Sequence, residues 1–301
     1  MIKIGITGGA SPVAGELIRI LINHPDVRIC QIYADGLAGR DINSVHHGLI
    51  GECALKFDGE INPDKLDVLF VADKTNVSTP TVDEYPELYV IDMTADFQAA
   101  RQQDSLVVYG VPEVNRKALV RGARRAVIPP AEEILICVAL LPLALRSMLP
   151  SEVTIDLQAT DELTNDARVQ YANVSNAFKL CGNEPAPRFV INCQPADSER
   201  TMRITTKLNL DLPLDNIVDM YEEIFDDHNL TYVVGESVPD KEVEGTDKCI
   251  ITLDKTSDGL LMVQAVADAR LRGGAGDAIH VMNLLKGLYE KTGLALRAST
   301  F

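Results

Sequence analysis

Gly8, Ser11 and Asp35 are spaced as residues that could hold a dinucleotide. Gly8 follows a strand-like run at 2–7, and a helix-like run begins just after Ser11. Small residues in such a turn let the backbone approach a pyrophosphate, and the helix start offers N–H donors to it. Asp35 ends the next strand-like run, where a carboxylate accepts a ribose 2′-hydroxyl and repels a 2′-phosphate. We therefore expect NAD rather than NADP, with contacts at this turn from Gly8, Ser11, Pro12, Val13 and Asp35.

The same residues also have a structural interpretation. A βα turn requires small residues whether or not a ligand binds, and Asp35 could be a solvated loop acid. The absence of any cofactor therefore remains an alternative to NAD.

The elements that must position these residues fall into two parts of the sequence with different predicted secondary structure. Strand-like runs at 2–7, 27–34, 66–72 and 89–93 are separated by longer connections and predict a parallel sheet with right-handed crossovers. From Val153 strands outnumber helices, at 154–159, 189–192, 202–208, 248–253 and 260–266, with a helix at 214–226. We expect an α/β fold: a Rossmann-type parallel-sheet domain of residues 1–128 and 270–301, and an α+β domain with a largely antiparallel sheet at 129–269.

Composition limits the partners. The chain has 301 residues, 46% of them hydrophobic, and a formal net charge of −16, which argues against nucleic acid and anionic membranes. No apolar run reaches the length of a membrane span, and residues 134–145 read as a buried helix. The strand-like N-terminus lacks the features of a signal peptide. Six cysteines without CxxC spacing favour reduced thiols in a cytoplasmic protein, and five irregularly spaced histidines give no metal pattern.

Two further runs connect the chain to a known family. Residues 109–116 read YGVPEVNR and residues 90–97 read VIDMTADF. They resemble the YGLPELNR and VIDLSADF runs of the N-acetyl-γ-glutamyl-phosphate reductases, a family of arginine biosynthesis in the semialdehyde dehydrogenase superfamily. The resemblance covers nearly the whole chain. It implies a Rossmann-type cofactor domain and an α+β domain that carries substrate and subunit contacts.

The C-terminal part of the resemblance adds expected cofactor contacts. Residues 273–288 are similar to the family's KGAAGQAVQNMNLMFGL segment, a glycine-rich turn and helix that line the nicotinamide side. The resemblance places Gly274, Ala275, Gly276 and Asn283 there. A structural role in closing the two domains would preserve the same residues.

The family's catalytic residues are replaced. By resemblance, the nucleophilic cysteine falls at Ala131 and the general-base histidine at Asn183. A glutamate of the same motif becomes Arg188, and the substrate-binding arginine becomes Gln98. Alanine offers no nucleophile and asparagine exchanges no proton near neutral pH. Cys181 is the thiol nearest the lost base in sequence, but no histidine stands beside it.

Three hypotheses follow. The first is a degenerate paralogue that binds NAD without reducing an acyl phosphate. The second is an enzyme with thioester-free hydride transfer that uses Lys74, Glu132 or Asp161 as acid or base. The third is a non-catalytic binding or regulatory subunit. Such a subunit could associate with an active homologue through the second domain. Separately, we expect a homodimer or tetramer, because the strands at 202–208, 248–253 and 260–266 are apolar enough to serve a subunit interface.

Overall fold

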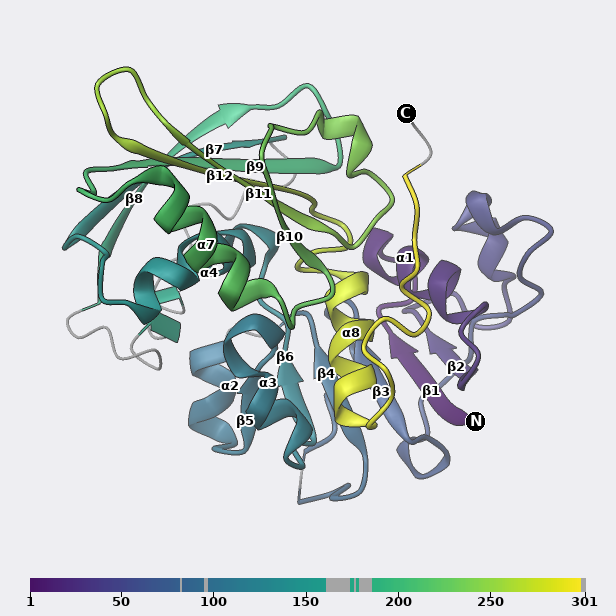
Figure 1. The fold of residues 1–301 in the computed structure, drawn as a ribbon. Helices are drawn as coiled ribbons and strands as arrows, with labels where there is room; N and C mark the ends of the chain where they lie inside the picture. Colours follow the sequence, from purple (N-terminus) through teal and green to yellow (C-terminus); the bar gives the residue numbers. More distant parts are fainter. Residues whose placement is uncertain (82, 95–96, 161–173, 176, 179–185, 299–301) are drawn as a thin grey trace. The chain divides into compact units, whose positions relative to one another are not determined.

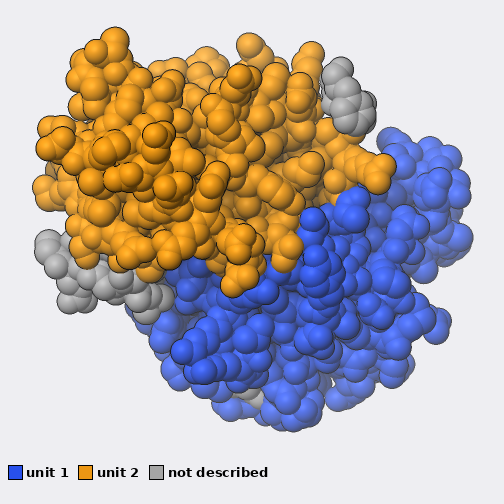
Figure 2. All heavy atoms as spheres, viewed as in Figure 1, with its two compact units in different colours: residues 1–129, 273–295 blue, residues 130–272, 296–301 orange. Residues whose placement is uncertain are grey.

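The computed structural model describes residues 1–81, 83–94, 97–160, 174–175, 177–178 and 186–298. The chain forms two compact units, Met1–Pro129 with Gly273–Ala295, and Pro130–Arg272 with Leu296–Phe301 (Figure 2). The first unit thus resumes a few residues later than the expected position 270, and it ends before the C-terminus.

The first unit is built on a six-stranded sheet in the order β2-β1-β3-β4-β6-β5, and every pair of neighbouring strands is parallel (Figure 1). The strands are β1 (Ile2–Thr7), β2 (Val27–Tyr33), β3 (Val68–Val71), β4 (Tyr89–Asp92), β5 (Val107–Tyr109) and β6 (Arg125–Val127). This confirms the Rossmann-type prediction. From β1 the chain moves first to one side and then, at β3, to the other, so the carboxyl ends of β1 and β3 flank the switch point where such sheets bind ligands.

The helices of this unit lie on the two faces of its sheet. Right-handed crossovers place the β1–β2 and β5–β6 connections on one face, and the β3–β4 and β4–β5 connections on the other. The first face carries α1 (Pro12–Leu21), α3 (Pro112–Val120) and α8 (Ala275–Leu285), and α8 packs against the other two helices and β4. The second face carries α2 (Phe97–Gln103). Three short 3₁₀ turns lie between β2 and β3: η1 (Ile42–Ser44), η2 (His47–Leu49) and η3 (Pro63–Lys65).

The β3–β4 connection lacks a helix in its described residues, 72–81 and 83–88. A parallel crossover usually contains one, because the helix covers the apolar face of the sheet. Here an irregular loop takes its place, so part of that face is covered less completely.

The second unit contains a mixed sheet in the order β10-β11-β12-β9-β7-β8. Its strands are β7 (Glu152–Ala159), β8 (Arg188–Pro195), β9 (Thr201–Leu208), β10 (Thr231–Val234), β11 (Cys249–Lys255) and β12 (Leu261–Asp268). The three central pairs are antiparallel and the two outer pairs, β7–β8 and β10–β11, are parallel. This agrees with the expected largely antiparallel sheet. A 3₁₀ turn, η4 (Asp240–Glu242), precedes β11.

Helices α4 (Ala131–Leu145) and α7 (Leu214–Phe225) pack against this sheet. Every residue of α4 from Ala131 to Ala144 is buried, as expected of a helix that is apolar on all sides. Tyr221 of α7 is fully buried and donates a hydrogen bond of 2.7 Å to the Ala139 carbonyl of α4. Burial raises the pKa of its hydroxyl far above the ordinary value, so Tyr221 stays neutral and the bond persists over the working pH range.

The apolar residues of β9 belong to the core of their own unit. Met202, Ile204 and Leu208 are buried, whereas Arg203 and Thr205 between them are only partly covered and Lys207 is exposed. Because alternate residues of a strand face opposite sides, the apolar set packs toward the helices and the outer face is polar. The apolar character of this strand is therefore explained within the protomer and gives no support for a subunit interface, so the homodimer or tetramer stays a prediction.

Within the described residues, no helix is both long and apolar enough to cross a membrane. The same part of the chain holds no group of three or more histidine, cysteine or acidic side chains placed to bind a metal ion.

Candidate functional site

The β1–α1 turn lies at the switch point of the first sheet and is packed too tightly for side chains. Gly8 has a φ of +68°, and a Cβ there would lie 2.4 Å from the backbone nitrogen of Asp73, in the loop after β3. A Cβ on Gly9 would lie 2.4 Å from Cγ2 of Ile32 in β2. Both glycines are buried and are required by the close approach of three neighbouring strand ends. We call this turn, residues 8–13, the β1–α1 cradle.

Ser11 begins α1 as its N-cap. Its Oγ accepts the N–H of Ala14 at 3.2 Å, and its own N–H donates to the Gly8 carbonyl at 3.0 Å. Pro12 has no N–H to offer. The N–H groups of Ala10 and Val13 lie at this helix start, where the first N–H groups of a helix have no intrahelical acceptor. Two backbone donors and the positive end of the helix dipole can thus receive a phosphate.

Asp35 follows β2 and is held by two neighbours. Its Oδ1 accepts the hydroxyl of Tyr33 at 2.8 Å, and its two oxygens lie 3.4 and 3.2 Å from the N–H of Asn76 in the loop after β3. The hydrogen bond to Asp35 raises the pKa of Tyr33, because the phenol donates to an ionised carboxylate. The carboxylate is exposed and fixed in position at the edge where Gly8 turns. Its remaining lone pairs can accept ribose hydroxyls.

The adjacent histidines do not form a pair. His46 Nε2 lies 2.7 Å from the Gly9 carbonyl, and a Cβ on Gly15 would come within 2.7 Å of His46 Nδ1. His47 instead bonds the Asn43 carbonyl at 3.1 Å. His46 therefore ties the η1–η2 region to the β1–α1 turn, which supports the structural interpretation of these residues.

Helix α8 brings the C-terminal glycine-rich turn to the same edge of the sheet. Near its end, Asn283 Oδ1 lies 3.2 Å from Nε2 of His24, which follows α1. Since α1 and α8 pack together and their C-terminal ends meet, their N-terminal ends lie at the same edge. Gly274, Ala275 and Gly276 are thus placed at the edge that carries Gly8.

Asn283 itself has a supporting role in the structure. Its Nδ2 donates to the carbonyls of Glu290 and Thr292 at 3.0 and 2.9 Å, and its side chain is fully buried. Both donors of the amide are therefore used by the segment that follows α8. This residue fixes the helix end, and we leave it out of the proposed cofactor contacts.

A buried charged group stands beside Asn283. His280 Nε2 lies 3.0 Å from Oε2 of Glu290, and Arg116 of α3 donates to Oε1 of the same carboxylate at 3.1 Å. The Glu290 and His280 side chains are almost completely buried, so this pairing fastens the residues after α8 to α3.

The positions of the lost catalytic residues are described only in part. Ala131 is the first residue of α4 and is 6% exposed, and the buried carboxylates of Glu132 and Glu133 follow it in the first turn. Arg188 begins β8 and forms an exposed ion pair of 3.3 Å with Glu152 of β7. Asn183, Cys181 and Asp161 lie outside the described residues. Gln98 belongs to α2, but its side chain is outside the described part.

Two residues of the site, Tyr33 and Asn76, are not among those predicted from the sequence. Tyr33 could have been found, because residues two apart on a strand point to the same side and a phenol there can reach the carboxylate of Asp35. Asn76 contributes a backbone N–H from a loop distant in sequence, and no pattern of residue types indicates that contact.

Solved structures place this architecture in a known class. The chain aligns over 96% of its length with 99% of aspartate semialdehyde dehydrogenase II from Vibrio cholerae, with a TM-score of 0.67 and 13% identity. An aspartate semialdehyde dehydrogenase from Candida albicans, solved with NADP, gives the same TM-score and identity over 95% of this chain and 98% of that one. Residues 3–121 match the family model of the semialdehyde dehydrogenase NAD-binding domain. The chain thus has the semialdehyde dehydrogenase fold with its nucleotide-binding domain.

Full-length relatives narrow the class. The chain is 33% identical over 325 residues to N-acetyl-gamma-glutamyl-phosphate reductase from Bacteroides fragilis, with 100% of both chains covered. It is 33% identical over 327 residues to the protein of that name from Parabacteroides distasonis, again with 100% of both covered. The chain belongs to the N-acetyl-γ-glutamyl-phosphate reductase family.

Proposed function

We propose that this chain is an NAD-binding member of its family that does not reduce an acyl phosphate. The observation that carries the proposal is Ala131 at the start of α4, where the family resemblance puts the nucleophilic cysteine. A reductase of this type forms a thioester before hydride transfer, and a methyl group cannot take part in that step. The fold and the β1–α1 cradle remain suited to a dinucleotide oxidoreductase.

The surroundings of Ala131 also disfavour the parent chemistry. Glu132 and Glu133 are 5% and 2% exposed, so two carboxylates are buried in the turn that begins with Ala131. By resemblance the general base is also replaced, by Asn183, so the group that would deprotonate a thiol at 131 is missing as well. The parent chemistry therefore lacks more than the nucleophilic sulfur, and we expect that Ala131→Cys alone does not restore turnover.

The preference for NAD is supported by Asp35. Tyr33 and Asn76 hold this carboxylate just after β2, where the ribose of a dinucleotide would lie in our proposal. A 2′-phosphate near it loses about 1–4 kcal/mol of binding free energy at surface dielectric values. This range includes the about 1.4 kcal/mol of a tenfold difference, and we expect NADP to bind at least about tenfold more weakly than NAD.

Titration and turnover test the proposal together. NADH and NADPH are titrated into the full chain and followed by nicotinamide fluorescence, and phosphate-dependent oxidation of N-acetylglutamate semialdehyde is assayed with both oxidised cofactors. The related Bacteroides fragilis reductase serves as the positive control. We expect saturable NADH binding and no turnover above background.

The possible contrary results separate the alternatives. Turnover comparable to the control would refute the loss of chemistry. Turnover of a free aldehyde with NAD alone would favour thioester-free hydride transfer. Failure to bind either dinucleotide would overturn the cofactor proposal and leave a binding or regulatory subunit.

A further inference from the structure

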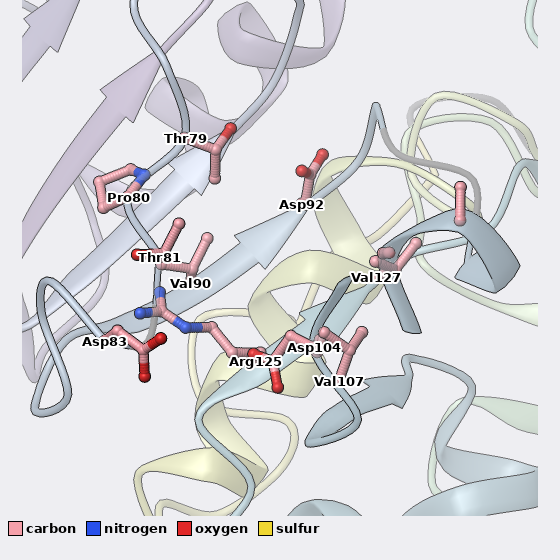
Figure 3. Close-up of a pocket in the computed structure, with 13 residues that line it drawn as sticks. Thr79, Pro80, Thr81, Asp83, Val90, Asp92, Asp104, Val107, Arg125 and Val127 are labelled. Atoms are coloured by element: carbon pink, nitrogen blue, oxygen red, sulfur yellow. The ribbon is translucent and has the colours of Figure 1, made fainter. Parts of the chain in front are cut away.

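The first unit has a pocket on the sheet face opposite α8, away from the β1–α1 turn. It has a volume of about 390 Å³ and lies where a helix of the β3–β4 connection would normally cover the strands (Figure 3). Val90 of β4, Val107 of β5 and Val127 of β6 give it an apolar floor. The walls come from loop residues 79–81 and 83 and from α2.

Arg125 of β6 lines this pocket, and two of its side-chain nitrogens lack hydrogen-bond acceptors among the described residues. Its side chain runs toward the loop that carries Thr81 and Asp83 (Figure 3), and the residue is only 6% exposed. Nη2 donates to the Tyr85 carbonyl at 3.1 Å, but the buried Nε and Nη1 have no acceptor among the described residues. A guanidinium stays protonated in proteins even though burial lowers the pKa of Arg125. Burying a cation whose N–H donors lack acceptors costs free energy, unless an anion binds and accepts those hydrogen bonds.

Acidic groups also line the pocket, but they do not complete Arg125. Asp104 lies near enough to raise the pKa of Arg125 through its charge, but within the described part of the chain neither Nε nor Nη1 donates a hydrogen bond to a carboxylate. Asp104 accepts the N–H of Leu106 at 2.8 Å, and Asp92 accepts both the N–H and the hydroxyl of Thr94. The pocket therefore presents one cationic group and, separately, a set of carboxylates.

This separation of charge selects the class of ligand. A carboxylate supplies the acceptors that Nε and Nη1 lack, and charge-assisted bonds to a guanidinium are among the strongest. An ammonium group on the same ligand can pair with Asp104 or Asp83. A phosphate dianion would meet several carboxylates for one arginine, so it is disfavoured. The apolar floor can receive a short hydrocarbon side chain.

We propose that this pocket binds a free amino acid, with its carboxylate on Arg125 and its ammonium group on Asp104 or Asp83. The pocket lies along the sheet face, whereas the cradle at Gly8 lies at the carboxyl edge of the sheet. The pocket and the cradle share the loop after β3 but no lining residue, so the proposal does not rest on dinucleotide binding or on the lost acyl-phosphate chemistry.

Calorimetry on the full chain provides the test. The probes are the common amino acids, propionate as a carboxylate without an amine, propylamine as an amine without a carboxylate, and inorganic phosphate. We expect at least one amino acid to bind saturably with a Kd of about 1 mM or tighter, and the single-charge probes and phosphate to bind at least about tenfold more weakly.

Arg125→Met should weaken that binding at least about tenfold, because the carboxylate loses its charge-assisted bonds. Arg121→Met is the matched control, since Arg121 is exposed just before β6 and its loss removes the same charge. Removing a poorly paired buried cation should leave the fold intact. Asp104→Asn provides a second test, because it should reduce the difference in affinity between the amino acid and propionate.

Three outcomes would overturn the proposal. They are no saturable amino-acid binding, tighter binding of phosphate than of any amino acid, and binding that Arg121→Met weakens as much as Arg125→Met. NADH titration of the same variants separates this proposal from the proposed function, because Arg125→Met should leave NADH affinity unchanged.

Discussion

Asp35 sets the choice between the two dinucleotides in our proposal. Asp35→Ser removes the charge that opposes a 2′-phosphate while it keeps a hydrogen-bonding group. We expect the ratio of NADPH to NADH dissociation constants to fall at least about tenfold. Fluorescence titration of both cofactors measures it, with Asp64→Asn as a control that removes an acid from the exposed end of η3. An unchanged ratio would show that Asp35 does not set the cofactor preference, and Arg40 would be the next residue to test.

The Tyr33 hydroxyl reports on the same carboxylate. Its pKa is raised above 10.0 because it donates to Asp35, so the bond is intact below that pH and is lost as the pH rises through the raised value. Absorbance of the phenolate should show this tyrosine titrating later in the wild type than in Asp35→Asn, with Tyr33→Phe identifying its signal. Coincident curves for the wild type and Asp35→Asn would show that the bond does not form in solution.

At the scale of elements, Ser11 determines how α1 begins. Ser11→Ala removes the acceptor of the Ala14 N–H and should lower the free energy of unfolding by about 1 kcal/mol, whereas glycine at an N-cap costs only a few tenths. Urea denaturation of both variants measures the difference. Equal losses would indicate that the hydroxyl does not cap the helix. Ser11→Gly also frees a third N–H donor, so its NADH affinity should not fall.

Elements with strong local signals could be predicted, and those set by long-range packing could not. The bounds of β1 were predicted as observed, because alternating β-branched residues end at a glycine pair, and Ser11-Pro12 marked the start of α1. β5 and β6 were missed, because three residues are too few to show a period. The orphaned nitrogens of Arg125 could not be predicted either, because its surroundings include a loop that is distant in sequence. The Tyr85 carbonyl that Arg125 bonds lies 40 residues before it.

At the scale of the whole molecule, the expected homodimer or tetramer remains a prediction. In the resembled family the second sheet lies near a symmetric interface, and here its outer face is polar, with Gln264 bonded to Thr205 across β12 and β9 at 3.2 Å. We expect a dimer by light scattering at micromolar concentration, with an interface of roughly 2,000 Å² or more.

Thr205→Arg should dissociate this dimer, because two-fold symmetry would bring two new charges together. Glu222→Lys, on an exposed position of α7, is the control and should not dissociate it. A monomer in the wild type would defeat the prediction, and a dimer unaffected by Thr205→Arg would place the interface elsewhere.

The return of the chain to its first unit has a consequence during synthesis on the ribosome. The sheet of that unit is complete by Val127, but α8, which is buried along its whole length, is made only after Pro130–Arg272. At roughly 5–20 residues per second, the surface that α8 will cover stays open for about ten seconds to half a minute. The nascent protein must therefore keep an apolar face from aggregating while its second unit is translated, and the first unit cannot close before the second exists.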